Sequence, residues 1–280
     1  ALRAARELGY SVASVYSTID RDQKHLKLSD EAICIGPPET KDSYLNEAAI
    51  ISAAELSGAD AIYPGFGFLA ENASFAEKCR ESGFKFIGPD PEVIAIMGDK
   101  IKAKELAKSL NIPVVPGYEG EISTENEAIK IVEEIGYPVI IKASAGGGGR
   151  GMRVVNSSDE LWQSIQSAQN EAELAFGDGK IFIEKYLKKP RHIEVQIFGN
   201  GKGEAVHLFT RDCSLQRKYQ KIVEEAPALN IDNQKLEEIQ NLSVEACKKL
   251  NYEGAGTIEF LYENNDFYFI EMNTRIQVEH

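Results

Sequence analysis

The ten residues from Glu271 to His280 alternate between polar and mostly apolar side chains. Because successive side chains of a β-strand point to opposite faces, this alternation predicts a strand with one polar face. That face gathers two carboxylates, two amides and a guanidinium, a set suited to holding a metal and an oxyanion together: Glu271, Asn273, Arg275, Gln277 and Glu279. Such a strand needs a sheet neighbour with a compatible face, and this requirement constrains the fold most.

Residues 256–262 supply that neighbour. They place one carboxylate, Glu259, inside an otherwise apolar strand, and residues 263–266 are typical of a turn. A turn centred on Asn265 puts Glu259 directly opposite Glu271, whereas a two-residue loop would put them on opposite faces. We therefore predict a hairpin centred on Asn265, with both glutamates as candidate Mg²⁺ ligands. The alternative is a solvent-exposed pair of glutamates on an amphipathic strand.

The composition limits the class of protein. A chain of 280 residues with a net charge of −13 is long enough for two domains and too acidic for a nucleic-acid partner, since phosphate contacts need a basic surface. No apolar run reaches the ~20 residues of a membrane span, and four widely separated cysteines predict reduced thiols. We expect a cytoplasmic protein without a membrane partner. The chain opens without Met and stops within a predicted strand, so we expect a fragment of a longer protein, truncated at both ends.

The order of strand and helix patterns predicts an α/β part followed by an α+β part. Over residues 1–98, short β-rich runs alternate with helical stretches, which predicts a Rossmann-like N-terminal domain with a parallel sheet and its first strand missing. A helical linker over residues 99–113 follows. Residues 114–187 form a second unit with a glycine-rich hairpin, and residues 188–280 form a third, with four strands, one long helix and its C-terminal part missing.

A run of glycines, Gly146 to Gly149, is followed by Arg150 and Gly151 and formally satisfies the G-x-G-x-x-G fingerprint. A dinucleotide site needs a helix after the run, but residues 152–155 have the pattern of a second strand. We interpret the run as a hairpin tip that can bring backbone N–H groups close to a phosphate chain, because glycine has no Cβ. A phosphate-binding lid is favoured over an inert flexible loop.

Three further charged residues lie at the ends of predicted elements. Lys142 ends an apolar strand, and Lys100 sits in the first turn of a helix, where a cation opposes the helix dipole. Two such lysines beside a glycine hairpin favour polyphosphate binding. Glu184 also ends a strand and could meet a nucleobase, although a solvated strand end is the better interpretation of this residue alone. Residues 211–221 form a cation-dense loop that suits an anionic substrate or plain solvent exposure equally well.

Together these residues resemble the biotin carboxylase component of the biotin-dependent carboxylases (acetyl-CoA, propionyl-CoA and pyruvate carboxylases), in the ATP-grasp superfamily. The resemblance runs from end to end and rests on residues 63–72, 142–152, 184–186, 191–194, 211–221 and 271–280. Tyr219 departs from the family, which often has His there, and so does the start of the 63–72 segment, where the family often has His-Pro-Gly-Tyr. The resemblance implies a pre-ATP-grasp domain followed by an ATP-grasp fold with a glycine-rich lid subdomain.

The resemblance also implies a role for each candidate site residue. ATP would contact Lys100, Lys142, Gly147, Gly148, Gly149, Glu184, Lys185, Leu187, His192 and Gln216. One or two Mg²⁺ ions, replaceable by Mn²⁺, would bind Glu259, Glu271 and Asn273. Bicarbonate would contact Lys221, Arg275, Gln277 and Val278. Glu279 would be the general base, with Lys221 and Arg275 as the other catalytic residues.

The implied activity is a ligase reaction, the ATP-dependent carboxylation of biotin by bicarbonate through carboxyphosphate. The implied partners are a biotin carboxyl carrier protein or domain, a carboxyltransferase and a second copy of the chain, in a setting such as acetyl-CoA carboxylase and fatty acid biosynthesis. We expect the 280 residues alone to have little or no carboxylase activity. Two rival readings are another ATP-grasp carboxylate–amine ligase and a nucleotide-binding module without catalysis.

Overall fold

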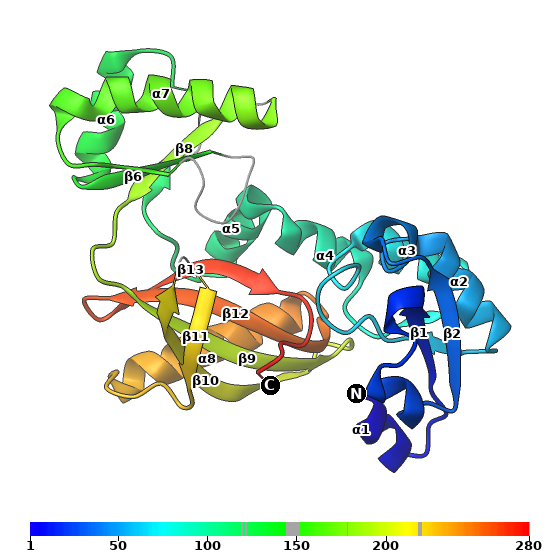
Figure 1. Cartoon of the computed structure of the whole chain (residues 1–280). Coiled ribbons are helices and arrows are strands. Elements are labelled where there is room, and N and C mark those ends of the chain that lie inside the picture. The colour runs from blue at the N-terminus through cyan, green and yellow to red at the C-terminus, as the bar shows by residue number, and fades with distance from the viewer. Residues whose placement is uncertain (119, 121, 144–151, 178, 218–219, 280) are drawn as a thin grey trace.

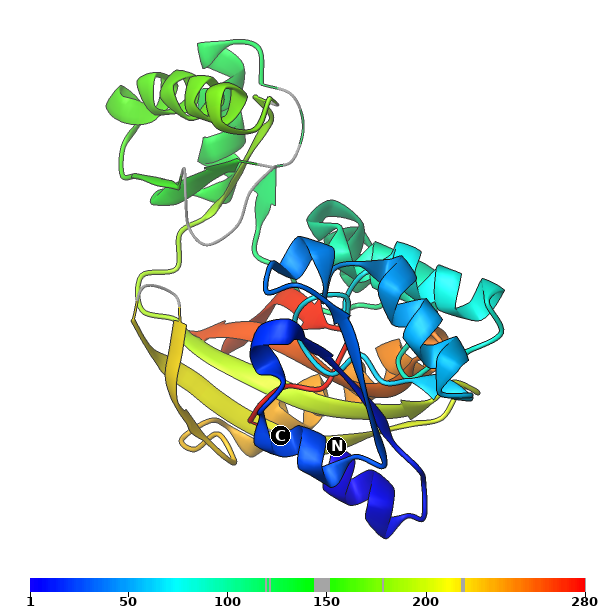
Figure 2. The ribbon, with the colours of Figure 1, turned by 45° about the vertical axis from the view of Figure 1, so that its right-hand side comes forward.

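The computed structural model describes residues 1–118, 120, 122–143, 152–177, 179–217 and 220–279. Figures 1 and 2 show an N-terminal part in blue and cyan, a central sheet in yellow to red, and a green subdomain that lies apart from the N-terminal part in both views. Within the described residues no helix is long and apolar enough to cross a membrane.

The N-terminal part contains two pairs of parallel strands. The strands are β1 (Ala13–Ser17), β2 (Glu31–Gly36), β3 (Ala61–Ile62) and β4 (Lys85–Phe86), and the helices are α1 (Leu2–Glu7), α2 (Glu47–Leu56) and α3 (Ala73–Glu81), with 3-10 turns η1 (Thr18–Asp20), η2 (Lys24–Leu28) and η3 (Thr40–Asp42). β1 pairs with β2 and β3 with β4, both in parallel as predicted, although the described ladders do not join the pairs into one sheet. Asn46 and Asn72 cap α2 and α3 by accepting N–H groups of their first turns.

Two helices connect this part to the rest of the chain. The first, α4 (Pro91–Gly98), was not expected from the sequence, although Pro at its first position is a common helix start. The second, α5 (Lys100–Ser109), has Lys100 in its first turn as predicted, and the Asp99 carboxylate caps it by accepting the N–H groups of Ile101 and Lys102.

The green subdomain is a four-stranded antiparallel sheet with two helices packed on it (Figure 1). Its elements are β5 (Gly117–Tyr118), α6 (Glu125–Ile135), β6 (Val139–Ala143), β7 (Arg153–Val155), α7 (Ser158–Phe176) and β8 (Ile181–Lys185), with the strand order β5-β8-β6-β7. β6 and β7 pair antiparallel, so the glycine run connects two strands of a hairpin as predicted. The run itself, with Gly147, Gly148 and Gly149, lies outside the described residues.

The central part is a five-stranded antiparallel sheet. Its elements are β9 (Arg191–Asn200), β10 (Ala205–Arg217), β11 (Gln220–Glu225), α8 (Asn233–Lys249), β12 (Glu253–Glu263) and β13 (Asp266–Asn273), with the strand order β11-β10-β9-β12-β13. The prediction of a loop over residues 211–221 was wrong, because most of these residues lie in β10 and β11. A long charged strand is hard to distinguish from a loop by composition when its polar side chains pair with other charges.

The hairpin of β12 and β13 has the predicted partners but not the predicted turn. Its loop has two residues, Asn264 and Asn265, both with positive φ, which is the type I′ geometry. The ladder pairs Phe260 with Phe269 but Glu259 with Glu271, so a β-bulge at Ile270 adds one residue. The bulge, and not the turn, places Glu259 and Glu271 opposite each other.

The predicted long terminal strand was partly wrong, because β13 ends at Asn273. Residues 274–279 follow without strand structure, and the N–H of Thr274 donates to the Glu71 carboxylate at 3.2 Å. The polar stripe is therefore divided between a strand and an irregular segment. Side-chain contacts, and not strand alternation, decide where Arg275, Gln277 and Glu279 lie.

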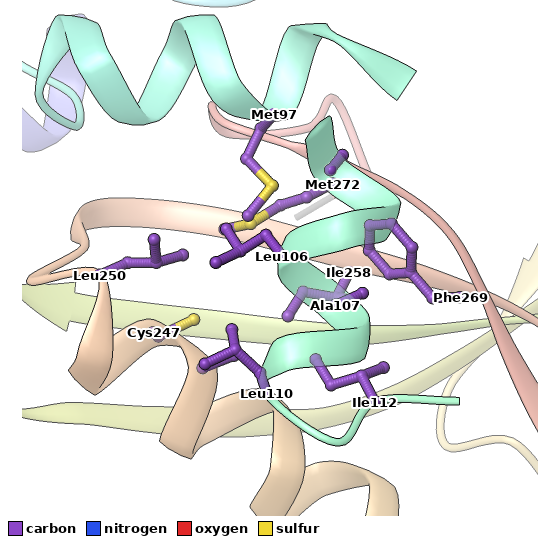
Figure 3. A pocket seen from close by; sticks show the side chains of 12 residues that line it. Met97, Leu106, Ala107, Leu110, Ile112, Cys247, Leu250, Ile258, Phe269 and Met272 are labelled. Carbon is purple, nitrogen blue, oxygen red and sulfur yellow. The ribbon is translucent and has the colours of Figure 1, made fainter. Parts of the chain in front are cut away.

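An apolar core between the central sheet and the helices fixes which face of β13 is polar. Figure 3 shows Met97 of α4, Leu106 and Ala107 of α5 and Cys247 of α8 around Ile258 and Met272 of the sheet. The space left between these side chains is only about 10 Å³, so the packing is tight. Met272 faces this core, and its neighbours Glu271 and Asn273 consequently face the other side.

Candidate active site

Three carboxylates form a row across the middle of the central sheet. Glu259 of β12 pairs with Glu194 of β9 on one side and with Glu271 of β13 on the other. Glu194 is fully buried, Glu259 is 4% exposed, and Glu271 is exposed. Glu194 was not among the predicted site residues, although it lies two residues after His192 and therefore on the same face of the strand.

Cations surround the two buried carboxylates. Lys221 Nζ lies 2.9 Å from Glu259 Oε1 and contacts Glu194 Oε1. His192 Nε2 lies 2.8 Å from Glu259 Oε2, and Arg211 Nη2 lies 3.0 Å from Glu194 Oε2. The structure thus brings the predicted residues Lys221, His192 and Glu259 together, and adds Glu194 and Arg211.

These contacts shift the pKa of each member. Burial alone raises the pKa of Glu194, but its hydrogen bonds with His192 and Lys221 and the nearby positive charges lower it to about 2. Burial alone lowers the pKa of His192, but the two glutamates outweigh it and raise the pKa to about 9. Opposite charges stabilise ionised forms, so the cluster is strongly ionic.

The outer carboxylate of the row behaves differently. The pKa of Glu271 is raised, first by partial burial and then by the charge of Glu259, while Lys100 offsets part of this effect. Asn273 Nδ2 donates to Glu259 Oε1 at 2.6 Å. Among the described residues, His192, Glu194 and Glu259 form a group whose potential metal-ligand atoms lie within 4.8 Å of one another, and Glu271 is not part of it. The repulsion between Glu259 and Glu271 is nevertheless of the kind that a divalent cation relieves, so oxygen ligands here fit Mg²⁺.

Side-chain contacts hold the segment after β13. Arg275 Nε donates to Glu71 Oε2 at 2.8 Å, and its Nη2 donates to Asn273 Oδ1 at 3.1 Å. Gln277 is 6% exposed, and its Oε1 accepts from Thr257 Oγ1 at 2.9 Å. Gln277 and Arg275 are therefore both directed by partners distant in sequence.

The last two predicted residues of this segment, Val278 and Glu279, are exposed. Glu224 of β11 is a neighbouring carboxylate that was not among the predicted site residues. Its pKa is raised by burial first and then by the charges of Glu279 and Glu194. The negative charge of Glu279 therefore extends the carboxylate cluster toward the surface.

A second ionic group surrounds Glu184 of β8, in the subdomain that contains β5 to β8. Glu184 is 3% exposed, so its interpretation as a solvated strand end was wrong. Lys142 Nζ of β6 lies 2.5 Å from Glu184 Oε2, and Lys104 Nζ of α5 contacts Glu184 Oε1. Both ammonium groups lie over the ring of Phe182, at 4.6 Å for Lys104 and 5.8 Å for Lys142. Lys104 was missed, because a lysine within a polar helix resembles a surface residue.

The remaining predicted nucleotide contacts are Lys185, Leu187 and Gln216. Lys185 Nζ donates to the carbonyl oxygens of Gly136 and Tyr137 at 2.8 and 3.0 Å, so its side chain holds the end of α6. Leu187 is half-buried between β8 and β9. Gln216 Nε2 lies 2.8 Å from His192 Nδ1 and thus reaches the carboxylate cluster.

The antiparallel lid subdomain and the five-stranded antiparallel sheet, which carries the carboxylate row, define an ATP-grasp fold. Residues 1–94 match the biotin carboxylase N-terminal domain, and residues 99–280 match the ATP-binding domain of the carbamoyl-phosphate synthase L chain. The chain belongs to the biotin carboxylase family.

Individual relatives agree with this assignment. Biotin carboxylase from Pseudomonas aeruginosa is 55% identical over 280 residues, which are 100% of this chain and 62% of that protein. A biotin carboxylase–βγ-ATP complex from Campylobacter jejuni is 50% identical with a TM-score of 0.89, covering 100% of this chain and 63% of that one. The biotin carboxylase domain dimer of Hydrogenobacter thermophilus 2-oxoglutarate carboxylase, with MgADP, ADP and bicarbonate, is 48% identical with a TM-score of 0.87, covering 100% and 62%. The chain thus spans less than two thirds of these relatives.

Proposed function

We propose that this chain provides the ATP- and bicarbonate-binding part of an enzyme that carboxylates biotin. The observation that carries the proposal is the row Glu194–Glu259–Glu271, with Lys221 against it and Arg275 on the following segment. The carboxylates of this row can bind a metal ion, and the neighbouring cationic side chains can bind an anion. The MgADP and bicarbonate in the Hydrogenobacter thermophilus structure support the same pair of ligands here.

In this proposal bicarbonate binds to the cationic end of the site. Lys221 and Arg275 neutralise its charge, the Gln277 amide donates a hydrogen bond, and the Val278 backbone N–H donates another. Glu279 is exposed, and its carboxylate can accept the bicarbonate proton. The deprotonated oxygen then attacks the γ-phosphate of ATP and forms carboxyphosphate and ADP. Charge neutralisation around the transferred group is the main catalytic contribution in such a step.

ATP would lie between the two ionic groups. Lys142 and Lys100 hold its phosphates under the glycine hairpin of Gly147, Gly148 and Gly149, and Glu184, Lys185 and Leu187 meet the adenine. His192 and Gln216 line the rest of the pocket. Glu259, Glu271 and Asn273 would hold one or two Mg²⁺ ions, or Mn²⁺, which when bound would neutralise the phosphate oxygens.

Carboxyphosphate then breaks down to CO₂ and phosphate. The phosphate removes the proton from the ureido nitrogen of biotin, and the nitrogen captures CO₂ to give carboxybiotin. The biotin would be carried by a biotin carboxyl carrier protein or domain and would pass its carboxyl group to a carboxyltransferase.

We further propose a homodimer, a cytoplasmic location and a role such as fatty acid biosynthesis. The successive structural units in this proposal are residues 1–98, 99–113, 114–187 and 188–280.

The proposal is tested by Glu279→Gln in the full-length protein, with Glu81→Gln on α3 as the control for an exposed glutamate. We expect Glu279→Gln to lower biotin carboxylation by at least about 100-fold and Glu81→Gln to leave it unchanged. Unchanged carboxylation by Glu279→Gln would remove Glu279 as the base. Bicarbonate-dependent ATP cleavage in the parent protein without carboxylation of biotin would instead favour an amine-using ligase.

A further inference from the structure

We infer that Arg211 and Thr257 are positioning residues that fix the amide of Gln277 with its nitrogen toward bicarbonate. The inference rests on the proposed function, since it concerns the same anion site. Neither residue touches the proposed substrate. They act through Gln277, which lies beyond the end of β13 and therefore has no strand ladder to hold it.

Arg211 reaches Gln277 from β10 through the interior of the sheet. It is 8% exposed, its Nη1 donates to Gln196 Oε1 at 2.9 Å, and its Nη2 lies 3.0 Å from Glu194 Oε2. The same Nη2 donates to Gln277 Oε1. Thr257 of β12 is fully buried and adds its hydroxyl at 2.9 Å from Gln277 Oε1. Two donors thus converge on one amide oxygen.

The chemistry of these donors sets the orientation of the amide. A guanidinium has only N–H donors and no acceptor, so the Gln277 atom that faces Arg211 must be the oxygen. Turning the amide by 180° would set its NH₂ against the guanidinium and leave a buried donor unpaired, which is costly. The Nε2 group therefore points away from Arg211, and it lies 3.5 Å from Glu259 Oε1.

This orientation determines what Gln277 can bind. Its oxygen is occupied inside the sheet, so it offers only N–H donors to a ligand. A bicarbonate oxygen can accept such a hydrogen bond, whereas ammonia or another amine acting as a donor cannot. Arg211 and Thr257 therefore make Gln277 selective for an anion that accepts hydrogen bonds. Gln196 supports this arrangement, because its Nε2 donates to the Gly256 carbonyl at 3.0 Å while its Oε1 accepts from Arg211.

The test uses Thr257→Val in the full-length protein, because valine has the shape of threonine and removes only the hydroxyl. Thr210→Val is the matched control: Thr210 is also buried, and its hydroxyl accepts the Ala228 N–H away from Gln277. We expect Thr257→Val and Arg211→Lys each to raise the KM for bicarbonate at least about fivefold, with the KM for ATP changed by less than about twofold. Thr210→Val should change neither KM.

A double-mutant cycle separates positioning from general destabilisation. If Thr257 acts through Gln277, adding Thr257→Val to Gln277→Ala should raise the bicarbonate KM no further. An additive effect, an unchanged bicarbonate KM in Thr257→Val, or equal rises of the KM for ATP and the KM for bicarbonate would overturn the inference.

If these variants fail to fold, Gln277→Glu provides the test. It keeps an oxygen for Arg211 but presents an oxygen to the ligand, so we expect a folded protein that is not saturated by bicarbonate. A normal bicarbonate KM in that variant would overturn the inference. If the unmutated full-length protein does not cleave ATP in a bicarbonate-dependent manner, the proposed function itself is wrong.

Discussion

Glu259 lies directly opposite Glu271 because of a β-bulge at Ile270. The bulge lies within β13 and is separate from the turn at Asn264 and Asn265. The two-residue turn at Asn264 and Asn265 alone would have sent the two carboxylates to opposite faces. The turn and the bulge therefore make separate contributions: the turn joins the strands, and the bulge sets the face of the site.

This separation predicts the outcome of two changes in the hairpin. Asn265→Val forces a β-branched residue into positive φ, so we expect it to lower the free energy of unfolding by about 1–2 kcal/mol while ATP and bicarbonate binding stay normal. Deleting Ile270 removes the extra residue and leaves Glu271 directly after Phe269, so Glu271 should still lie opposite Glu259 and metal-dependent nucleotide binding should be retained. Urea unfolding and nucleotide titration check both. Loss of metal-dependent nucleotide binding in a folded Ile270 deletion variant would contradict this account of the bulge.

Substitutions of the two lysines that contact Glu184 should have different effects. Lys104 is 9% exposed and belongs to the buried side of the pair, so Lys104→Met should lower the free energy of unfolding by about 1–3 kcal/mol. Lys142 is more accessible and is the proposed phosphate ligand, so Lys142→Met should weaken ATP binding at least about tenfold. Thermal unfolding and isothermal titration distinguish the two. Equal effects of both variants on ATP affinity would contradict this division.

The same group predicts a pH dependence of stability. Burial raises the pKa of Glu184, but the charges of Lys142 and then Lys104 outweigh it, so the pKa is lowered from its ordinary value. The folded state therefore binds its proton less readily than the unfolded state. This stabilisation is complete above the ordinary glutamate pKa of about 4.3 and is lost as the pH falls through the lowered value in the folded state.

The pH prediction is checked by urea unfolding between pH 3 and 7 with Glu184→Gln for comparison. The difference in unfolding free energy between the parent and Glu184→Gln should shrink as the pH falls below about 4.3. Glu225→Gln, at an exposed glutamate of β11, is the control and should follow the parent. A constant difference across this range would show that Glu184 contributes no such linkage.

Glu71 connects the N-terminal part to the proposed bicarbonate site through Arg275. Glu71→Gln should cost about 0.5–1 kcal/mol of stability, since the pair is partly exposed and screened by salt. It should also raise the KM for bicarbonate, because Arg275 loses the carboxylate that orients it. Glu253→Gln breaks the exposed pair with Lys85 at 2.6 Å, also between these parts, and should leave that KM unchanged. Equal KM values in the two variants would contradict the orienting role.

The helix α5 and the antiparallel strands around the glycine run could be predicted from local patterns. The capping of α5 by Asp99 and the position of Lys100 at its start follow from a signal within four residues. The strand β11 could not be predicted, because its charged residues gain their stability from partners such as Glu194, contributed by another strand. The buried position of Lys104 could not be predicted for the same reason, because its partner Glu184 lies 80 residues away in the sequence.

The sequence by itself determined which residues of the final segment are polar, and that Met272 and Glu271 must face opposite sides, because side-chain alternation in a strand is local. Only the tertiary structure decided that this strand ends at Asn273, that a bulge restores the face of Glu271, and that Arg211 and Thr257 hold Gln277. These outcomes depend on packing of the apolar face against α5 and on side-chain hydrogen bonds from β10 and β12 to the segment after β13. Such energies arise only when distant segments meet, so no local pattern carries them.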